Sequence, residues 1–144
     1  MSDPEFRMDS LPGEVFKLAR DLRNAMDREL VDYGLTTQQA TVLVMARVHG
    51  EGSIGHLAEP LGTDTAGLTR LIDRLEAKGL VARRNSDRDR RAVVIELTPA
   101  GEELIPHLTS AFRRVHQRLL EAMPESHVEQ FRAMVNRLRE KAQA

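Results

Sequence analysis

The apolar period of the sequence changes at Gly79, and this change limits the folds open to the chain. Before Gly79, four apolar residues recur at the spacing of one helix face, which predicts a helix over about residues 64–78. After it, the runs 80–84 and 92–97 are rich in β-branched residues and enclose a polar segment, 85–91. The pattern predicts a helix that leads directly into a β-hairpin with a charged tip. The four apolar residues are Leu68, Leu71, Ile72 and Leu75.

A second, shorter helix is expected immediately before this one. Ser53 is a suitable N-cap and Gly62 a suitable stop, while Thr63 or Asp64 caps the longer helix that follows. A short helix, a tight turn and a longer helix make a helix-turn-helix. The apolar residues that the short helix turns inward are Ile54, Leu57, Ala58 and Leu61.

Long amphipathic helices are expected on both sides of this unit. Apolar spacing predicts one helix over residues 10–34, and Thr36 with Gln39 fits a capping box at the start of a second helix. Thr98-Pro99 is a typical helix start, and a last helix begins near Pro124. The sequence therefore predicts a mainly α protein with a small β-hairpin wing, a winged helix-turn-helix.

Composition excludes several kinds of protein. The chain has no cysteine, which removes disulfides, thiolate metal sites and thiol redox sensing. Its histidines lack metal-ligand spacing, and no catalytic motif or phosphate-binding loop is present, so we expect no metal, no cofactor and no enzymatic activity. The longest apolar run, Ala40–Ala46, is too short to cross a bilayer, and no leader is legible, which favours a cytoplasmic protein. Residues 1–9 are set aside as a tag or disordered terminus.

Positive charge gathers in the predicted helix and hairpin. The whole chain has a formal charge of −1, but residues 64–91 contain eight basic and five acidic residues. A helix that reads a DNA major groove needs short side chains near its start and hydrogen-bonding side chains on its outer face. The candidates for this face are Thr65, Ala66, Thr69, Arg70 and Arg74.

The hairpin tip supplies a second candidate contact with DNA. Arginines on a protruding tip can enter a minor groove, whose negative potential is strongest where the groove is narrow. Arg88 and Arg90 are the candidates here.

Several stretches of the sequence together resemble the MarR family of bacterial regulators. They are IGHLAE at 54–59, TRLIDRLEAKGLV at 69–81, DRDRRAV at 87–93 and LTPAG at 97–101. The resemblance extends collinearly over residues 15–138. It implies a sequence-specific transcriptional regulator, a repressor whose affinity for a pseudo-palindromic double-stranded operator is modulated by a small-molecule effector.

The resemblance also implies an intertwined helical homodimer. Residues 10–34 and 99–144 then form the dimerisation region, and residues 35–98 form the DNA-binding lobe. The resemblance further implies that Arg91 pairs with Asp73, because the family has an ion pair at these positions that ties the wing to the helix.

A small aromatic or anionic effector is expected between the dimerisation helices and the lobe. The residues that would line this pocket are Phe16, Arg20, Arg23, Tyr33, Met45, His49 and Phe112. Two other functions stay open on the sequence: a winged-helix protein-interaction module that does not touch DNA, and an architectural DNA binder that tolerates any sequence.

Overall fold

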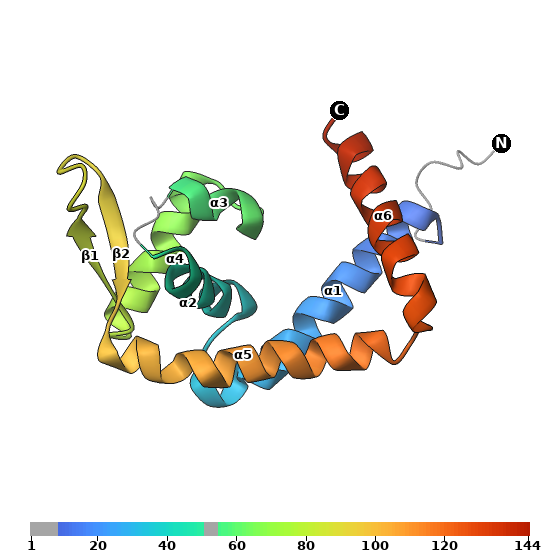
Figure 1. Ribbon diagram of the computed structural model, residues 1–144, viewed down its shortest axis with the longest axis horizontal. Coiled ribbons are helices and arrows are strands. Elements are labelled where there is room, and N and C mark those ends of the chain that lie inside the picture. Colours follow the sequence, from blue (N-terminus) through green and yellow to red (C-terminus); the bar gives the residue numbers. More distant parts are fainter. Residues whose placement is uncertain (1–8, 51–54) are drawn as a thin grey trace. The chain divides into compact units, whose positions relative to one another are not determined.

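A computed structural model describes residues 9–50 and 55–144, and its elements follow the predicted order (Figure 1). The chain is mainly helical with one antiparallel hairpin, which confirms the predicted fold class. The predicted cap Ser53 and the apolar Ile54 lie outside the described residues, as does the N-terminal segment before Asp9. The elements are α1 (Leu11–Leu30), the 3₁₀ helix η2 (Val31–Tyr33), α2 (Thr37–His49), α3 (Gly55–Leu61), α4 (Thr65–Ala77), β1 (Val81–Asn85), β2 (Val93–Leu97), α5 (Pro99–Leu120) and α6 (Glu125–Ala142).

Side-chain caps fix the starts of α2 and α4. The predicted capping box of α2 is confirmed, because the Gln39 amide donates to Thr36 Oγ1 at 3.3 Å and the Thr36 amide donates to Gln39 Oε1 at 3.1 Å. Of the two candidate caps for α4, Asp64 is the one used, and its Oδ1 accepts from the Gly67 amide at 2.7 Å. Helices α2 and α4 therefore each begin at a fixed residue.

Removal of the α2 cap is expected to destabilise the protein modestly. Thr36→Ala leaves the Gln39 amide without its acceptor, and the free energy of unfolding should fall by about 0.5–2 kcal/mol. Urea denaturation at one protein concentration measures this change. Thr36→Ser, which keeps the hydroxyl, serves as the control, and an equal loss in both variants would contradict the capping role.

The chain divides into two compact units, Met1–Ala111 and Phe112–Ala144. In the first unit the predicted apolar stripe of α4 is buried, and α4 packs against α2, α3 and β1. This packing holds α4 with its polar side outward. The fully buried large side chains of this unit are Leu30, Val42, Leu43, Leu68, Ile72, Leu75, Val81, Val94 and Leu108.

A network of hydrogen bonds joins the end of α4, the hairpin and the start of α5. Gly79 adopts a positive φ of 72°, which glycine tolerates, and Thr98 Oγ1 donates to its carbonyl at 2.6 Å. The Thr98 amide donates to the Leu80 carbonyl at 3.1 Å. A Cβ at Gly101 would lie 2.2 Å from that same carbonyl oxygen, so only glycine fits there. The turn after α4 and the first turn of α5 are thus joined by hydrogen bonds and close backbone packing, and this connection is called the joint at Thr98 below.

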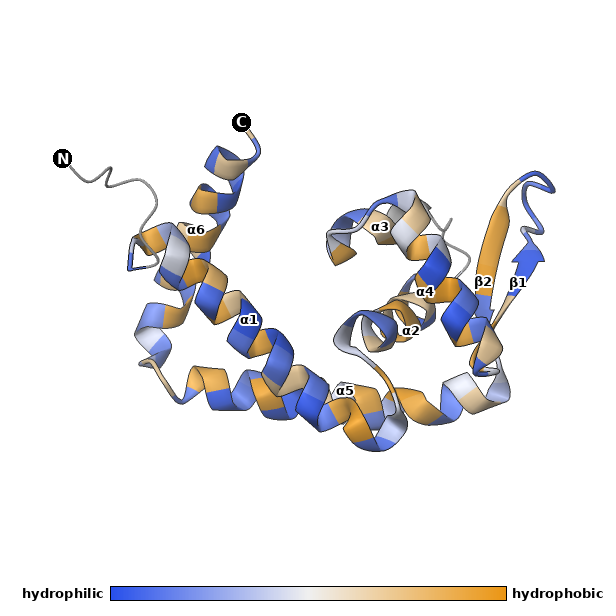
Figure 2. Cartoon of the chain, turned by 180° about the vertical axis from the view of Figure 1, so that it is seen from behind, coloured by the Kyte–Doolittle hydropathy of each residue, from blue (hydrophilic) through white to orange (hydrophobic). Residues whose placement is uncertain are grey.

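The second unit contains the end of α5 and the whole of α6. Figure 2 shows apolar and polar positions alternating along α6. Most of its apolar side chains are exposed, and Val128, Phe131 and Val135 line a hollow of about 310 Å³ with residues at the end of α5. No helix in the described ranges has the length and hydropathy needed to span a membrane.

Candidate nucleic-acid interface

The outer face of α4 carries the predicted recognition residues. Thr65, Ala66, Thr69, Arg70 and Arg74 are all exposed, because the opposite face of the helix is buried. Arg70 and Arg74 are four residues apart and therefore lie side by side on the helix surface. The helix thus presents a short-chained N-terminal end followed by two guanidinium groups.

A hollow of about 180 Å³ lies beside these arginines. It is lined by residues of α2, the turn before α4 and α4 itself, and none of its lining residues is acidic. Two of them, Gln38 and Thr63, are polar residues that the sequence analysis did not identify as site residues. Gln38 comes from α2, so only the packing of α2 against α4 reveals it, whereas Thr63 lies in the turn directly before α4 and was considered only as a helix cap. The lining residues are Gln38, Thr63, Gly67, Arg70, Leu71 and Arg74.

The hydroxyl of Thr69 is already engaged within the helix. Thr69 Oγ1 donates its proton to the Thr65 carbonyl at 2.9 Å. In this rotamer the oxygen keeps only its lone pairs for an outside partner. Thr69 is therefore arranged to accept a hydrogen bond rather than to donate one.

The hairpin tip is an organised turn around Ser86. This buried side chain accepts from the Arg88 amide at 3.2 Å and from the Asp89 amide at 3.4 Å. Asp89 Oδ1 in turn accepts from the Arg91 amide at 3.0 Å. The turn leaves the side chains of Arg88 and Arg90 exposed at the tip, which is hydrophilic in Figure 2.

The predicted ion pair between Asp73 and Arg91 is not the one in this structure. Asp73 instead accepts from Arg83 Nη2 at 2.6 Å. The reason is position: Arg83 lies on β1 next to α4, whereas Arg91 lies in the loop before β2, where its amide is held by Asp89. The tie between the hairpin and α4 exists, but a different arginine makes it.

The seven residues predicted to line an effector pocket do not gather around one hollow described here. Phe16, Arg20, Arg23 and His49 are exposed, and Phe16 exposes 73% of its surface. Tyr33 and Met45 are half-buried, and the Tyr33 ring packs against that of His107 with centroids 5.5 Å apart. Phe112, also half-buried, belongs to the second unit.

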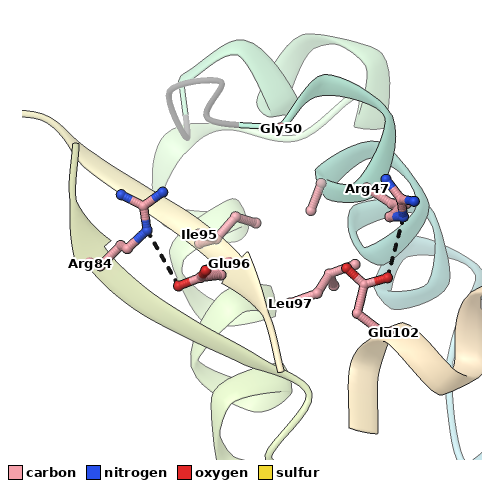
Figure 3. Close-up of a pocket in the computed structure, with 8 residues that line it drawn as sticks. Arg47, Gly50, Arg84, Ile95, Glu96, Leu97 and Glu102 are labelled. Atoms are coloured by element: carbon pink, nitrogen blue, oxygen red, sulfur yellow. Dashed lines mark ion pairs between the residues drawn. The ribbon is translucent and has the colours of Figure 1, made fainter. Parts of the chain in front are cut away.

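Another hollow, of about 220 Å³, opens between α2, the hairpin and α5 (Figure 3). Its charged residues form two ion pairs, Arg47 with Glu102 and Arg84 with Glu96, each with a nitrogen to oxygen distance of 3.3 Å. Both pairs are partly solvent-exposed and so add little to stability. The charges in this hollow cancel, which distinguishes it from the hollow beside α4. Among the described residues no group of three potential metal ligands comes together.

Comparison with known proteins identifies the same architecture. The sequence model of the MarR family matches residues 35–93, the segment from just before α2 to the first residue of β2. Among solved structures, the S. aureus MepR–DNA complex has a TM-score of 0.85 at 22% identity, over 92% of this chain and 98% of that chain.

Two further structures are similar at higher identity. CouR from Rhodococcus jostii bound to p-coumaroyl-CoA has a TM-score of 0.82 at 27% identity, over 93% of this chain and 94% of that chain. MarR has a TM-score of 0.74 at 28% identity, over 99% of this chain and 95% of that chain. The similarity therefore extends beyond the winged helix to the flanking helices.

Proposed function

We propose that the chain is a sequence-specific DNA-binding transcriptional regulator of the cytoplasm, because the MarR family model matches its residues 35–93 and the solved structure of MarR has a similar fold. MarR-family regulators are generally not enzymes, and we assign no catalysis to this chain. The proposed partner is a double-stranded, pseudo-palindromic operator. The observation that carries the proposal is the outer face of α4. Five exposed residues whose size and hydrogen-bonding groups suit a major groove lie there, opposite the buried face of the helix.

Each lobe, over residues 35–98, would contact two neighbouring grooves. Arg70 and Arg74 would reach base edges or phosphates in the major groove, and Ala66 would allow close approach of the backbone. Thr69 would accept from an exocyclic amino group of cytosine or adenine, because its proton is held by Thr65. The wing would place Arg88 and Arg90 in or along the flanking minor groove.

We propose that residues 10–34 and 99–144 join two copies into a homodimer. Exposed apolar side chains are concentrated in α1, the end of α5 and α6, and a soluble monomer rarely leaves so many uncovered. A second copy of the chain would cover them with an isologous interface. The side chains are Leu11, Val15, Phe16, Leu18, Leu119, Leu120, Phe131, Met134, Val135 and Leu138.

A small-molecule effector is proposed to weaken DNA binding, which makes the protein a repressor released by its ligand. CouR, similar in fold, is bound to p-coumaroyl-CoA in its crystal structure. In this chain an aromatic or anionic effector would contact the seven residues already named, which would require the second copy or a change of shape to bring them together. Unchanged DNA affinity across a panel of phenolic acids and their thioesters would contradict this part of the proposal.

Selection from a random duplex library tests the function. The wild-type protein should enrich one inverted repeat whose half-sites are about one helical turn apart, and random duplex should compete poorly for it. Enrichment without a consensus would favour the architectural DNA binder. No binding to any duplex at low salt would favour the protein-interaction module.

The wing assignment predicts a specific change in salt dependence. Arg88→Ala should reduce the slope of log affinity against log salt by about one unit, because one phosphate contact is lost. Titration of the selected duplex at several salt concentrations measures the slope. Arg47→Ala, which removes an exposed arginine paired with Glu102, is the control, and a full slope in the Arg88 variant would contradict the wing contact.

A further inference from the structure

The guanidinium of Arg83 is held from three directions at the junction of the hairpin and α4. Nη2 donates to Asp73 Oδ1 at 2.6 Å and to the Thr69 carbonyl at 3.4 Å, and Nη1 donates to Glu76 Oε1 at 2.9 Å. Its side chain is 27% exposed, less than either carboxylate partner. An arginine held by these three contacts has little freedom to reach a partner outside the protein.

The spacing on α4 explains why one arginine can make all three contacts. Thr69, Asp73 and Glu76 are four and three residues apart, so they lie on one face of the helix. The planar guanidinium can bridge two carboxylates, which the single ammonium of lysine cannot do in the same geometry. The Arg83 amide also donates to Glu76 Oε2 at 3.3 Å, so the strand backbone is tied to the helix as well.

The charge of Asp73 matters for any DNA contact made by α4. Asp73 is exposed and adjoins the row formed by Arg70 and Arg74 on the same outer surface. DNA carries one negative charge per about 1.7 Å of helix axis, so an uncompensated carboxylate at this place would oppose binding. In the structure the carboxylate is neutralised by Arg83.

We propose that Arg83 is a positioning residue for DNA binding: it neutralises Asp73 and Glu76 and ties the base of the wing to the recognition helix, without contacting DNA itself. The inference rests on the proposed function and adds a determinant of affinity to it. The alternative role is that Arg83 leaves the two carboxylates and binds a DNA phosphate directly.

The first arm of the test compares two neighbouring arginines. Arg83→Gln should lower affinity for the selected duplex at least about tenfold, or about 1.4 kcal/mol, because two carboxylates are released beside the phosphates. Arg84→Gln removes the same charge one residue along β1, from a side chain that pairs with Glu96 and Asp87. It should change affinity less than about threefold, which is about 0.7 kcal/mol.

The second arm removes the carboxylates. In the Arg83→Gln background, Asp73→Asn with Glu76→Gln should raise affinity at least about fivefold, about 1 kcal/mol, whereas the same pair of changes in the wild-type background should not lower it. Equal affinity of the Arg83→Gln protein with and without the two carboxylates would overturn the proposal. Thermal midpoints are measured in parallel, and a rescue that merely follows restored stability would also overturn it.

A third readout does not depend on DNA. Amide hydrogen exchange in residues 81–85 should be faster in the Arg83→Gln protein than in the wild type, because the tie to α4 is lost. If the wild type binds no duplex, the proposed function fails, while this exchange difference still tests the tie. Equal exchange in the two proteins would refute the tie even if the wild type binds DNA well.

Discussion

Replacement of Arg70 and Arg74 together by alanine is expected to abolish most of the specific DNA affinity. Each side chain that contacts a base edge contributes about 1–3 kcal/mol, so the double variant should lose about 2–6 kcal/mol, or at least about 30-fold. The reason is geometric: the two guanidinium groups are adjacent on the exposed face of α4 and border a hollow with no acidic lining residue. Fluorescence anisotropy with the selected duplex measures the loss.

A control variant and a competition experiment show whether the loss of affinity is specific to Arg70 and Arg74. Arg47→Ala, an exposed arginine of α2 paired with Glu102, should leave affinity within about threefold of the wild type, about 0.7 kcal/mol. Competition with random duplex separates the two kinds of contact, since loss of base contacts should narrow the gap between specific and random DNA. Full retention of specific affinity in the double variant would remove α4 as the recognition helix.

A charge placed in the apolar face of α6 is expected to separate the proposed dimer. Val135 exposes 36% of its surface and lines the hollow with Phe131, which exposes 43%. In a symmetric dimer Val135→Glu introduces two carboxylates into one interface, and the dimer dissociation constant should rise at least about 100-fold, about 2.8 kcal/mol. Light scattering coupled to size exclusion, over a range of protein concentrations, measures the change.

A matched variant tests whether the effect depends on the apolar face. Gln130→Glu adds the same charge at an exposed polar position of the same helix and should leave the dimer intact. Circular dichroism should report equal helix content in both variants. The Val135 variant should also bind the operator more weakly, because a monomer engages only one half-site. A Val135→Glu protein that stays dimeric would disprove this interface.

The local structure was predictable because its signals lie within a few residues. The buried stripe of α4 follows from spacing alone, and the capping box of α2 needs only Thr36 and Gln39. The hairpin follows from β-branched runs around a polar segment. Each of these features depends on backbone geometry that neighbouring residues determine.

The partner of Asp73 was not predictable in the same way. Which arginine reaches it depends on the hairpin register, in which Arg83 faces Ile95, and on how β1 lies against α4. The assignment to Arg91 was taken from the family resemblance and failed on that tertiary detail. Gln38 was missed for a related reason, since its proximity to Arg70 arises only when α2 packs against α4.

The joint at Thr98 makes α4 and α5 mechanically dependent on each other. The Thr98 hydroxyl holds the carbonyl at the end of the α4 turn, and Gly101 lets the first turn of α5 touch the Leu80 carbonyl without a side chain between them. Such a close-packed contact transmits a displacement of one helix to the other, because neither segment has free space in which to move. A ligand that rotates the start of α5 would therefore also turn α4, the proposed recognition helix, even if it bound far from the operator.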